Sequence, residues 1–329
     1  MRLETLPLAQ AAGHILCHNL ADPQGRKAFT KGRIVRPEDL PRLEELGLKA
    51  VRVAILDPDD VHEDEAAARL AAAVAGPGVS ATTPRTGRVN LRAEHAGPLE
   101  VDVEALLTIN EVDGLTVATL PEHTLVRPGL RLATIKVIPF AVPEADLARV
   151  EEMGRAAGGV LRVRPLQVRS VGVILVSSAA ARIRVERGVY PAIEGRVRDL
   201  GGEVIATRFV PPDETAVAAA VSELQAMGAE LIIAAGETSV VDLEDVTPRG
   251  VRLAGGRVEH YGAPVEPGNL LLLAYLDRSG AAPLPVLGAP GCVRSRDTNI
   301  VDLLLPRLMA GEQVRRRDIV ALGHGGLLG

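Results

Sequence analysis

The sequence predicts an α/β protein whose C-terminal part is a three-layer α/β/α domain around a mostly parallel sheet, preceded by a β-rich α+β module. Two observations lead to this prediction. After about residue 165, apolar strands alternate with amphipathic helices, and before it, short β-like runs alternate with turns rich in proline and glycine. A length of 329 residues also suits about two domains.

The N-terminal half consists of β-like runs that two helical stretches interrupt. Strands are expected at residues 50–56, 100–103, 116–120 and 133–140, and helices at 38–46 and 62–75. A further helix at 144–157, ended by Gly158 and Gly159, connects this half to the next. We therefore expect an N-terminal segment at 1–60, a β-rich module with its connecting helix at 61–165, and an α/β domain at 166–329.

The C-terminal half shows a regular alternation of buried strands and helices that end at glycines. Strands are expected at residues 171–176, 203–210, 231–235 and 286–288, and helices at 190–200, 213–227 and 299–309. This alternation is typical of a parallel sheet covered on both faces. Such sheets bind ligands in the crevice beyond the carboxyl ends of their strands.

Composition excludes several classes of partner. The chain has no Trp, three Tyr, three Phe and a net charge of −5, so it offers neither stacking platforms nor a basic footprint for nucleic acid. Two cysteines cannot build a disulfide framework or a zinc site alone. The first residues do not form a signal peptide, and the longest apolar stretch, 270–276, is too short to span a membrane. A cytoplasmic protein is expected.

Hydroxyls, carboxylates and glycine turns follow the predicted strands. They lie at residues 177–178, 211–214, 236–239 and 288–292. Backbone N–H groups at helix starts can bind an anion such as phosphate, and acidic residues on the same edge can hold hydrated Mg²⁺. The sequence therefore predicts a phosphate site at this edge of the sheet.

Several of these residues also have a simpler explanation. Asp213 is placed as an ordinary helix N-cap, Ser177 and Ser178 as turn residues, and Gly291 as part of a tight turn. Cys292 is either a small buried residue or a thiol activated near a helix N-terminus. The convergence of separate strand ends on the same chemistry favours a site.

One pair of segments resembles a known family. Residues 236–239, followed by Asp245, Val246, Thr247 and Pro248, resemble the glycine-rich loop and the Asp-Val-Thr-Pro element of molybdopterin-binding domains. The turns at 210–213 and 288–291 are similar to further family turns, so the resemblance covers residues 168–329. Residues 13–16, 31–33 and 46–51 are similar to early segments of molybdotransferase-like proteins, a group that also includes gephyrin-like fusions.

The resemblance implies a site and a chemistry. Adenylyltransferases of the family activate the molybdopterin phosphate with ATP and magnesium, and molybdotransferases then insert molybdate and release AMP. By this analogy Asp213 and Asp245 are the catalytic pair, with Asp213 also on the side of the metal. The implied cofactor-binding residues are Ser177, Ser178, Gly236, Glu237, Thr238, Ser239, Thr247, Pro290, Gly291 and Cys292. A homo-oligomer is also implied.

The phosphate loop differs from the family pattern at one position. Glu237 stands where the family usually has glycine, and a carboxylate beside a phosphate needs a metal or an arginine to compensate its charge. Five arginines near this loop in the sequence can supply that charge: Arg182, Arg184, Arg187, Arg294 and Arg296. A position on a solvated helix face explains their presence equally well.

Three functional hypotheses remain open. The first is a molybdopterin-binding protein of molybdenum cofactor biosynthesis that adenylylates molybdopterin or inserts molybdate. The second is a non-catalytic carrier or sensor of the cofactor, and the third is an enzyme acting on another phosphorylated metabolite at the same edge.

Three histidine-containing segments have non-catalytic explanations. His14 and His18 have the spacing of a metal pair on a helix, but their segment is β-like. Residues 62–65 have the acidic composition of a helix start. Residues 260–269 either line the same crevice from the side or form a hairpin between edge strands.

Overall fold

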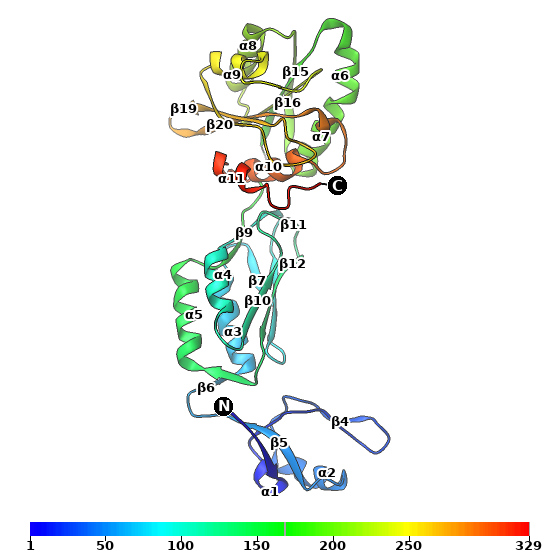
Figure 1. Cartoon of the computed structure of the whole chain (residues 1–329), viewed down its shortest axis with the longest axis vertical. Helices are drawn as coiled ribbons and strands as arrows, with labels where there is room; N and C mark the ends of the chain where they lie inside the picture. Colours follow the sequence, from blue (N-terminus) through cyan, green and yellow to red (C-terminus); the bar gives the residue numbers. More distant parts are fainter. Residues whose placement is uncertain (168, 329) are drawn as a thin grey trace. The chain divides into compact units, whose positions relative to one another are not determined.

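A six-stranded sheet forms the centre of the second of two units into which the chain divides, Met1–Arg164 and Pro165–Gly329. The computed structural model describes residues 1–167 and 169–328 (Figure 1). Val168 and Gly329, which fall within the predicted domain 166–329, lie outside the described residues. The three-part division at residues 60 and 165 stays a prediction.

The first unit is an α+β module of small, mostly antiparallel sheets. Its strands are β1 (Arg2–Pro7), β2 (Ile15–Leu16), β3 (Leu20–Ala21), β4 (Lys27–Phe29), β5 (Ala50–Ile55), β6 (Asp60–His62), β7 (Val79–Ala81), β8 (Arg88–Ala93), β9 (Gly97–Val101), β10 (Leu115–Thr119), β11 (Leu125–Val126), β12 (Arg131–Val137), β13 (Ala141–Pro143) and β14 (Leu161–Val163). Its helices are α1 (Leu8–Ala11), η1 (Pro37–Asp39), α2 (Leu40–Glu45), α3 (Glu63–Val74), α4 (Val103–Asn110) and α5 (Glu144–Ala156).

Helix α3 forms because alanine, the best helix former, fills half of its positions, and because acidic side chains occupy its first turn. Its buried face, which includes Leu70 and Val74, packs in one core with Leu91 of β8 and Ile135 of β12. Helix α4 was not predicted; its first residue, Val103, was placed in the strand expected at 100–103. Asp102 starts this helix by accepting a hydrogen bond from the backbone N–H of Ala105 at 3.0 Å.

The second unit contains a mostly parallel sheet with the strand order β16-β15-β17-β20-β19-β18. The strands are β15 (Ser170–Val176), β16 (Glu203–Val210), β17 (Leu231–Gly236), β18 (Gly256–Tyr261), β19 (Leu272–Arg278) and β20 (Ala281–Gly288). The first four in this order run parallel, and β19 and β18 complete the sheet in antiparallel pairing. Buried apolar side chains on both faces explain the continuous apolar strands.

Helices cover both faces of this sheet (Figure 1). They are α6 (Arg182–Gly188), α7 (Tyr190–Asp199), α10 (Ile300–Met309) and α11 (Arg316–Ala321) on one face, and α8 (Glu214–Ala226) and α9 (Val246–Leu253) on the other. The first face buries residues such as Ile193 and Leu304, and the second buries Val217 and Leu224. The predicted three-layer α/β/α domain with a mostly parallel sheet, preceded by a β-rich α+β module, is confirmed.

The register of the parallel strands brings their carboxyl ends to one level. Val176, the last residue of β15, pairs with Val210 of β16 and with Gly236 of β17. One strand further along, Ala234 of β17 pairs with Gly288 of β20. The loops that follow these residues therefore start at one edge of the sheet.

Several elements of this unit were not predicted, among them helices α6 and α11. Strands β18 and β19 were not predicted as strands, although they pair with each other as a hairpin at 260–269 requires. Helix α9 was not predicted either; Pro248 is tolerated there because it stands in the first helical turn. No helix in the described ranges is both long and apolar enough to cross a membrane.

Arg196 of α7 holds the loop after β20 in place. Its side chain is buried, and its guanidinium forms a two-pronged ion pair with Asp302 of α10, at 2.9 and 3.0 Å. It also donates to the backbone carbonyls of Val293, Ser295 and Asp297, at 2.9, 2.8 and 3.1 Å. A single buried guanidinium thus binds three backbone carbonyls of this loop.

We expect the substitution R196M to destabilise the second unit by about 3 kcal/mol, because it leaves buried carbonyls and a carboxylate without a partner. The measurement is urea unfolding followed by tyrosine fluorescence, which reports on this unit alone because Tyr190, Tyr261 and Tyr275 all lie in it. R198M, on the exposed side of the same helix, is the matched control and should change the stability little. Equal effects of the two substitutions would contradict the role of Arg196.

Candidate functional site

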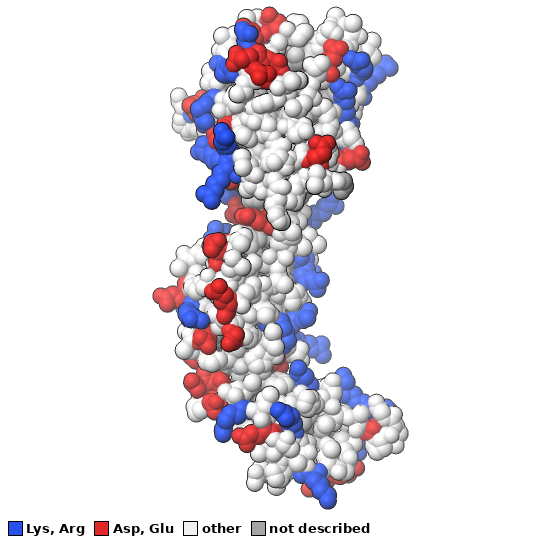
Figure 2. Space-filling model, in the orientation of Figure 1, with Lys and Arg blue, Asp and Glu red and all other residues white. Residues whose placement is uncertain are grey.

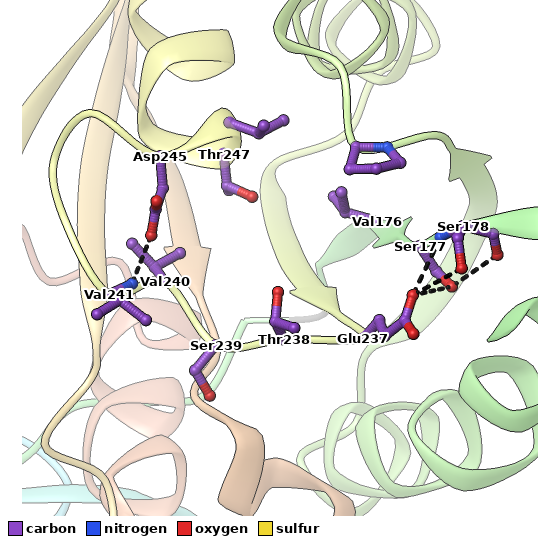
Figure 3. A pocket seen from close by; sticks show the side chains of 12 residues that line it. Val176, Ser177, Ser178, Glu237, Thr238, Ser239, Val240, Val241, Asp245 and Thr247 are labelled. Atoms are coloured by element: carbon purple, nitrogen blue, oxygen red, sulfur yellow. Dashed lines mark hydrogen bonds between the residues drawn. The ribbon is translucent and has the colours of Figure 1, made fainter.

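A pocket of about 440 Å³ lies at the carboxyl edge of the sheet in the second unit (Figure 3). One wall follows β15, another follows β17, and a third is the start of α9. Its lining residues are Val176, Ser177, Ser178, Pro212, Glu237, Thr238, Ser239, Val240, Val241, Asp245, Val246 and Thr247. The polar ones among them, from three separate segments, are the residues that the sequence singled out.

Glu237 crosses from the loop after β17 to the turn after β15. Its Oε2 accepts hydrogen bonds from the backbone N–H and the hydroxyl of Ser178, at 3.2 and 2.9 Å, and from the Ser177 hydroxyl at 3.4 Å (Figure 3). These donors are the ones that the sequence assigned to a phosphate. The chain's own carboxylate therefore occupies part of the predicted anion site.

Two arginines hold the Glu237 residue from outside the pocket lining. Arg184 of α6 donates from Nη2 to Glu237 Oε1 at 2.9 Å, and Arg294 donates to the backbone carbonyl of Glu237 at 2.9 Å. The hydrogen bonds from Ser178, with the charge of Arg184, hold the pKa of Glu237 below its usual value. The sequence called for a metal or an arginine to compensate the charge of this carboxylate. Arg184 provides that positive charge and stabilises the ionised form of Glu237.

The other predicted arginines do not reach the pocket lining. Arg182 pairs with Glu186 at 2.9 Å and lies over the ring of Phe209, and Arg296 pairs with Asp199. Arg187 is exposed on α6. Figure 2 shows basic side chains gathered over α6 and acidic side chains over α8 and α9.

Asp245 is the N-cap residue of α9, yet its side chain does not cap that helix. Its Oδ2 instead accepts hydrogen bonds from the backbone N–H groups of Val241 and Asp242, at 2.6 and 3.0 Å (Figure 3). This pairing closes the loop 241–245 into a tight turn. Oδ1 of Asp245 has no hydrogen-bond partner in the part of the chain that the structure describes, so one carboxylate oxygen remains available beside Thr247.

Asp213 lies outside the pocket lining, although its neighbour Pro212 belongs to it. Its Oδ1 caps α8 by accepting from the backbone N–H of Ala216 at 2.9 Å and from the Thr215 hydroxyl. This is the N-cap geometry that the sequence offered as the simpler explanation. Within residues 1–167 and 169–328, no three His, Cys, Asp or Glu side chains stand together as a metal site.

The turn after β20 contacts one residue of the pocket lining, Ser239. The backbone N–H of Gly291 donates to Ser239 Oγ at 2.9 Å, and a Cβ at Gly291 would lie 3.0 Å from that oxygen. Pro290, Gly291 and Cys292 themselves do not line the pocket. Cys292 is half-buried, and its burial raises the pKa of the thiol, which favours the packing explanation over an activated thiol.

Gly236 and the histidine segments have structural roles. Gly236 ends β17, where a Cβ would lie 2.9 Å from the carbonyl oxygen of Val176, so the close approach of the two strands requires glycine. His14 and His18 flank the short strand β2 and share no helix. His62 caps α3 by accepting a hydrogen bond from the backbone N–H of Asp64 at 3.3 Å.

Sequence reasoning missed three apolar residues of the pocket lining: Val176, Val240 and Val241. The signal that was available is the valine pair at 240–241, an apolar pair in a polar loop.

Comparison with family models identifies this part of the chain. Residues 172–310 match the model described as a probable molybdopterin binding domain. Residues 172–310 are called the molybdopterin-binding domain below, after this match. This molybdopterin-binding domain contains every residue of the pocket lining, and the resemblance of the Asp245–Pro248 element to that family is confirmed. Residues 5–55 match a second model, described as a domain of unknown function (DUF8806).

Solved structures are similar to a little less than half of the chain. The tungsten cofactor synthesizing protein MoaB from Pyrococcus furiosus is 19% identical over 45% of this chain and 98% of its own, with a TM-score of 0.33. The molybdopterin biosynthesis enzyme MoaB from Thermus thermophilus is 20% identical over 44% of this chain and 98% of its own, with a TM-score of 0.31. No curated protein sequence matches the chain.

We expect the substitution E237Q to strengthen the binding of inorganic phosphate to the molybdopterin-binding domain by about tenfold, because it removes a negative charge from the Ser177–Ser178 donors. Binding is measured as the phosphate-dependent rise in the free energy of unfolding, followed by tyrosine fluorescence. E244Q, which removes an exposed charge outside the pocket lining, is the control for general salt effects. Unchanged phosphate affinity in E237Q would show that the carboxylate does not compete for these donors.

The ionised Glu237 also predicts a pH dependence. Because its pKa in the folded state lies below the usual 4.5, its interactions stabilise the domain fully above about pH 4.5. This contribution is lost as the pH falls through the lowered folded pKa. We expect the stability difference between the natural protein and E237Q to shrink below pH 4.5; a difference that stays constant down to about pH 2.5 would contradict this assignment.

Proposed function

We propose that the pocket binds molybdopterin or its adenylylated form, and that the chain serves molybdenum cofactor biosynthesis. The observation that carries the proposal is the placement of the pocket: it lies at the carboxyl edge of the sheet in a domain of the molybdopterin-binding family, between the Ser177–Ser178 turn and the Asp245–Thr247 element. Ligands of open α/β sheets bind at this edge.

The lining supports recognition of the pterin by its edges. None of the lining residues is aromatic, so no ring of this pocket stacks on the ligand. The nearest tyrosine, Tyr261, donates its hydroxyl to the backbone carbonyl of Val240 at 3.2 Å. In our proposal, the free Oδ1 of Asp245 accepts from the pterin N–H groups, the hydroxyls of Thr238 and Thr247 bind other polar edges, and the valines exclude water.

A transferase reaction at this site would use the same residues. In adenylyl transfer, a phosphate oxygen of molybdopterin attacks the α-phosphorus of ATP, the new P–O bond forms, and pyrophosphate leaves. Asp245 would hold the pterin for this attack. ATP, molybdate, magnesium, a homo-oligomer and a cytoplasmic location belong to the proposal on the strength of the family resemblance. Because Asp213 caps α8 and does not line the pocket, we derive no step through magnesium.

A second candidate is a non-catalytic carrier or sensor of the cofactor. The contact of Glu237 with the Ser177–Ser178 donors favours it, because those donors are engaged by the chain before any phosphate arrives. A carrier needs to hold and release the pterin, whereas adenylyl transfer needs room for two phosphorylated reactants at this turn.

A binding and turnover experiment tests both candidates. We expect purified molybdopterin to bind saturably, and D245N to weaken the binding by about tenfold or more, because a hydrogen bond to a charged group is lost. D242N removes a charge from the same loop without touching the pocket lining and is the matched control.

Addition of Mg-ATP and molybdate then separates the candidates. Release of pyrophosphate or AMP that D245N abolishes would establish the transferase, and saturable binding without release would establish the carrier. Absence of molybdopterin binding at micromolar concentrations would contradict both and leave another phosphorylated metabolite as the ligand.

A further inference from the structure

The lysines of this chain are concentrated at one place. Only four of the 37 lysine and arginine residues are lysine, and none lies beyond residue 136. Three of them, Lys27, Lys31 and Lys136, line a single pocket of about 310 Å³ in the first unit. In a chain that otherwise uses arginine, this gathering of lysines indicates a requirement for the ammonium group.

Lys136 is fixed at one side of this lysine pocket. Its Nζ donates to Glu63 Oε2 at 3.1 Å and to the backbone carbonyl of Thr86 at 2.7 Å, which leaves one N–H of the ammonium. Glu63 is buried, and Gly87 packs over the pair so closely that a Cβ there would lie 2.5 Å from the carboxylate and 2.7 Å from Nζ. The pair is therefore a built part of the pocket and not a loose surface contact.

Lys27 and Lys31 form the other side and have no carboxylate partner among the described residues. Lys27 belongs to β4, and Lys31 follows it with its backbone N–H bonded to Asn19 Oδ1 at 2.9 Å. Nζ of Lys31 lies 5.3 Å from the centre of the Phe140 ring. Three lysines therefore face one carboxylate, and the pocket carries an excess of positive charge.

We propose that the lysine pocket binds a small molecule that carries a phosphate group. Elsewhere in the first unit, carboxylates are bound by arginine forks, as in the pairing of Arg69 with Glu144 at 2.7 Å from both terminal nitrogens. Lysine is instead a compact point charge with three rotatable donors, which suits a tetrahedral phosphate approached from several sides. The volume of the pocket suits a ligand of small-metabolite size.

This site is separate from the molybdopterin-binding domain, and one measurement reads it alone. Lysine labelled with ¹³C at Cε gives four signals in the full chain, and the domain at residues 172–310 contributes none. We expect inorganic phosphate, and pyrophosphate more strongly, to shift the signals of Lys27, Lys31 and Lys136 with one common Kd. The signal of Lys49, outside the pocket, serves as the internal control and should not move.

Variants and a second anion complete the test. K27Q/K31Q should raise the Kd for phosphate, measured from the Lys136 signal, by about tenfold or more, and K49Q should leave this Kd unchanged. Parallel shifts of all four lysines, tighter binding of citrate than of phosphate, or an unchanged Kd in K27Q/K31Q would each overturn the proposal. Binding of phosphate in the C-terminal domain leaves these signals unaffected, so failure here is distinguishable from failure of the proposed function.

Discussion

The site of the second unit depends on the parallel register of three strands. Val176 pairs with Val210 on one side and with Gly236 on the other, so the three strands stop at one level and release their loops at one edge. The apolar side chains that fix this register lie in the two cores on the faces of the sheet. Packing of valine, isoleucine and leucine thus places polar residues that are separated by tens of positions in the sequence.

Glu237 supplies an acceptor for the polar groups at the edge of the sheet. The Glu237 carboxylate is a hydrogen-bond acceptor for four donors. They are the hydroxyls of Ser177 and Ser178, the backbone N–H of Ser178 and the guanidinium of Arg184. Any anion that enters must displace this internal one or bind beside it. The affinity of the pocket for an anion then depends on how much more strongly that anion binds these donors than the Glu237 carboxylate does. A substitution of Glu237 is therefore expected to change the affinity for the ligand.

The two basic residue types divide their tasks according to their shapes. Arg196 uses its planar fork to join one carboxylate and three backbone carbonyls, which is a structural task that lysine cannot perform. Lys27 and Lys31, in contrast, line a pocket of the first unit and have no carboxylate partners in the described part of the chain.

The sequence by itself determined the fold class, the alternation of strands and helices after residue 165, and the strand-end positions of Ser177, Ser178 and Glu237, because periodicity and turn chemistry are local properties. It could not distinguish Asp213 as a helix cap from Asp213 as a ligand, nor detect helix α9. Only the tertiary structure decided that Glu237 spans to Ser178, that Asp245 binds the backbone of its own loop, and that three lysines meet around Glu63. Such contacts join residues far apart in the chain or depend on a side-chain direction, and neither follows from spacing.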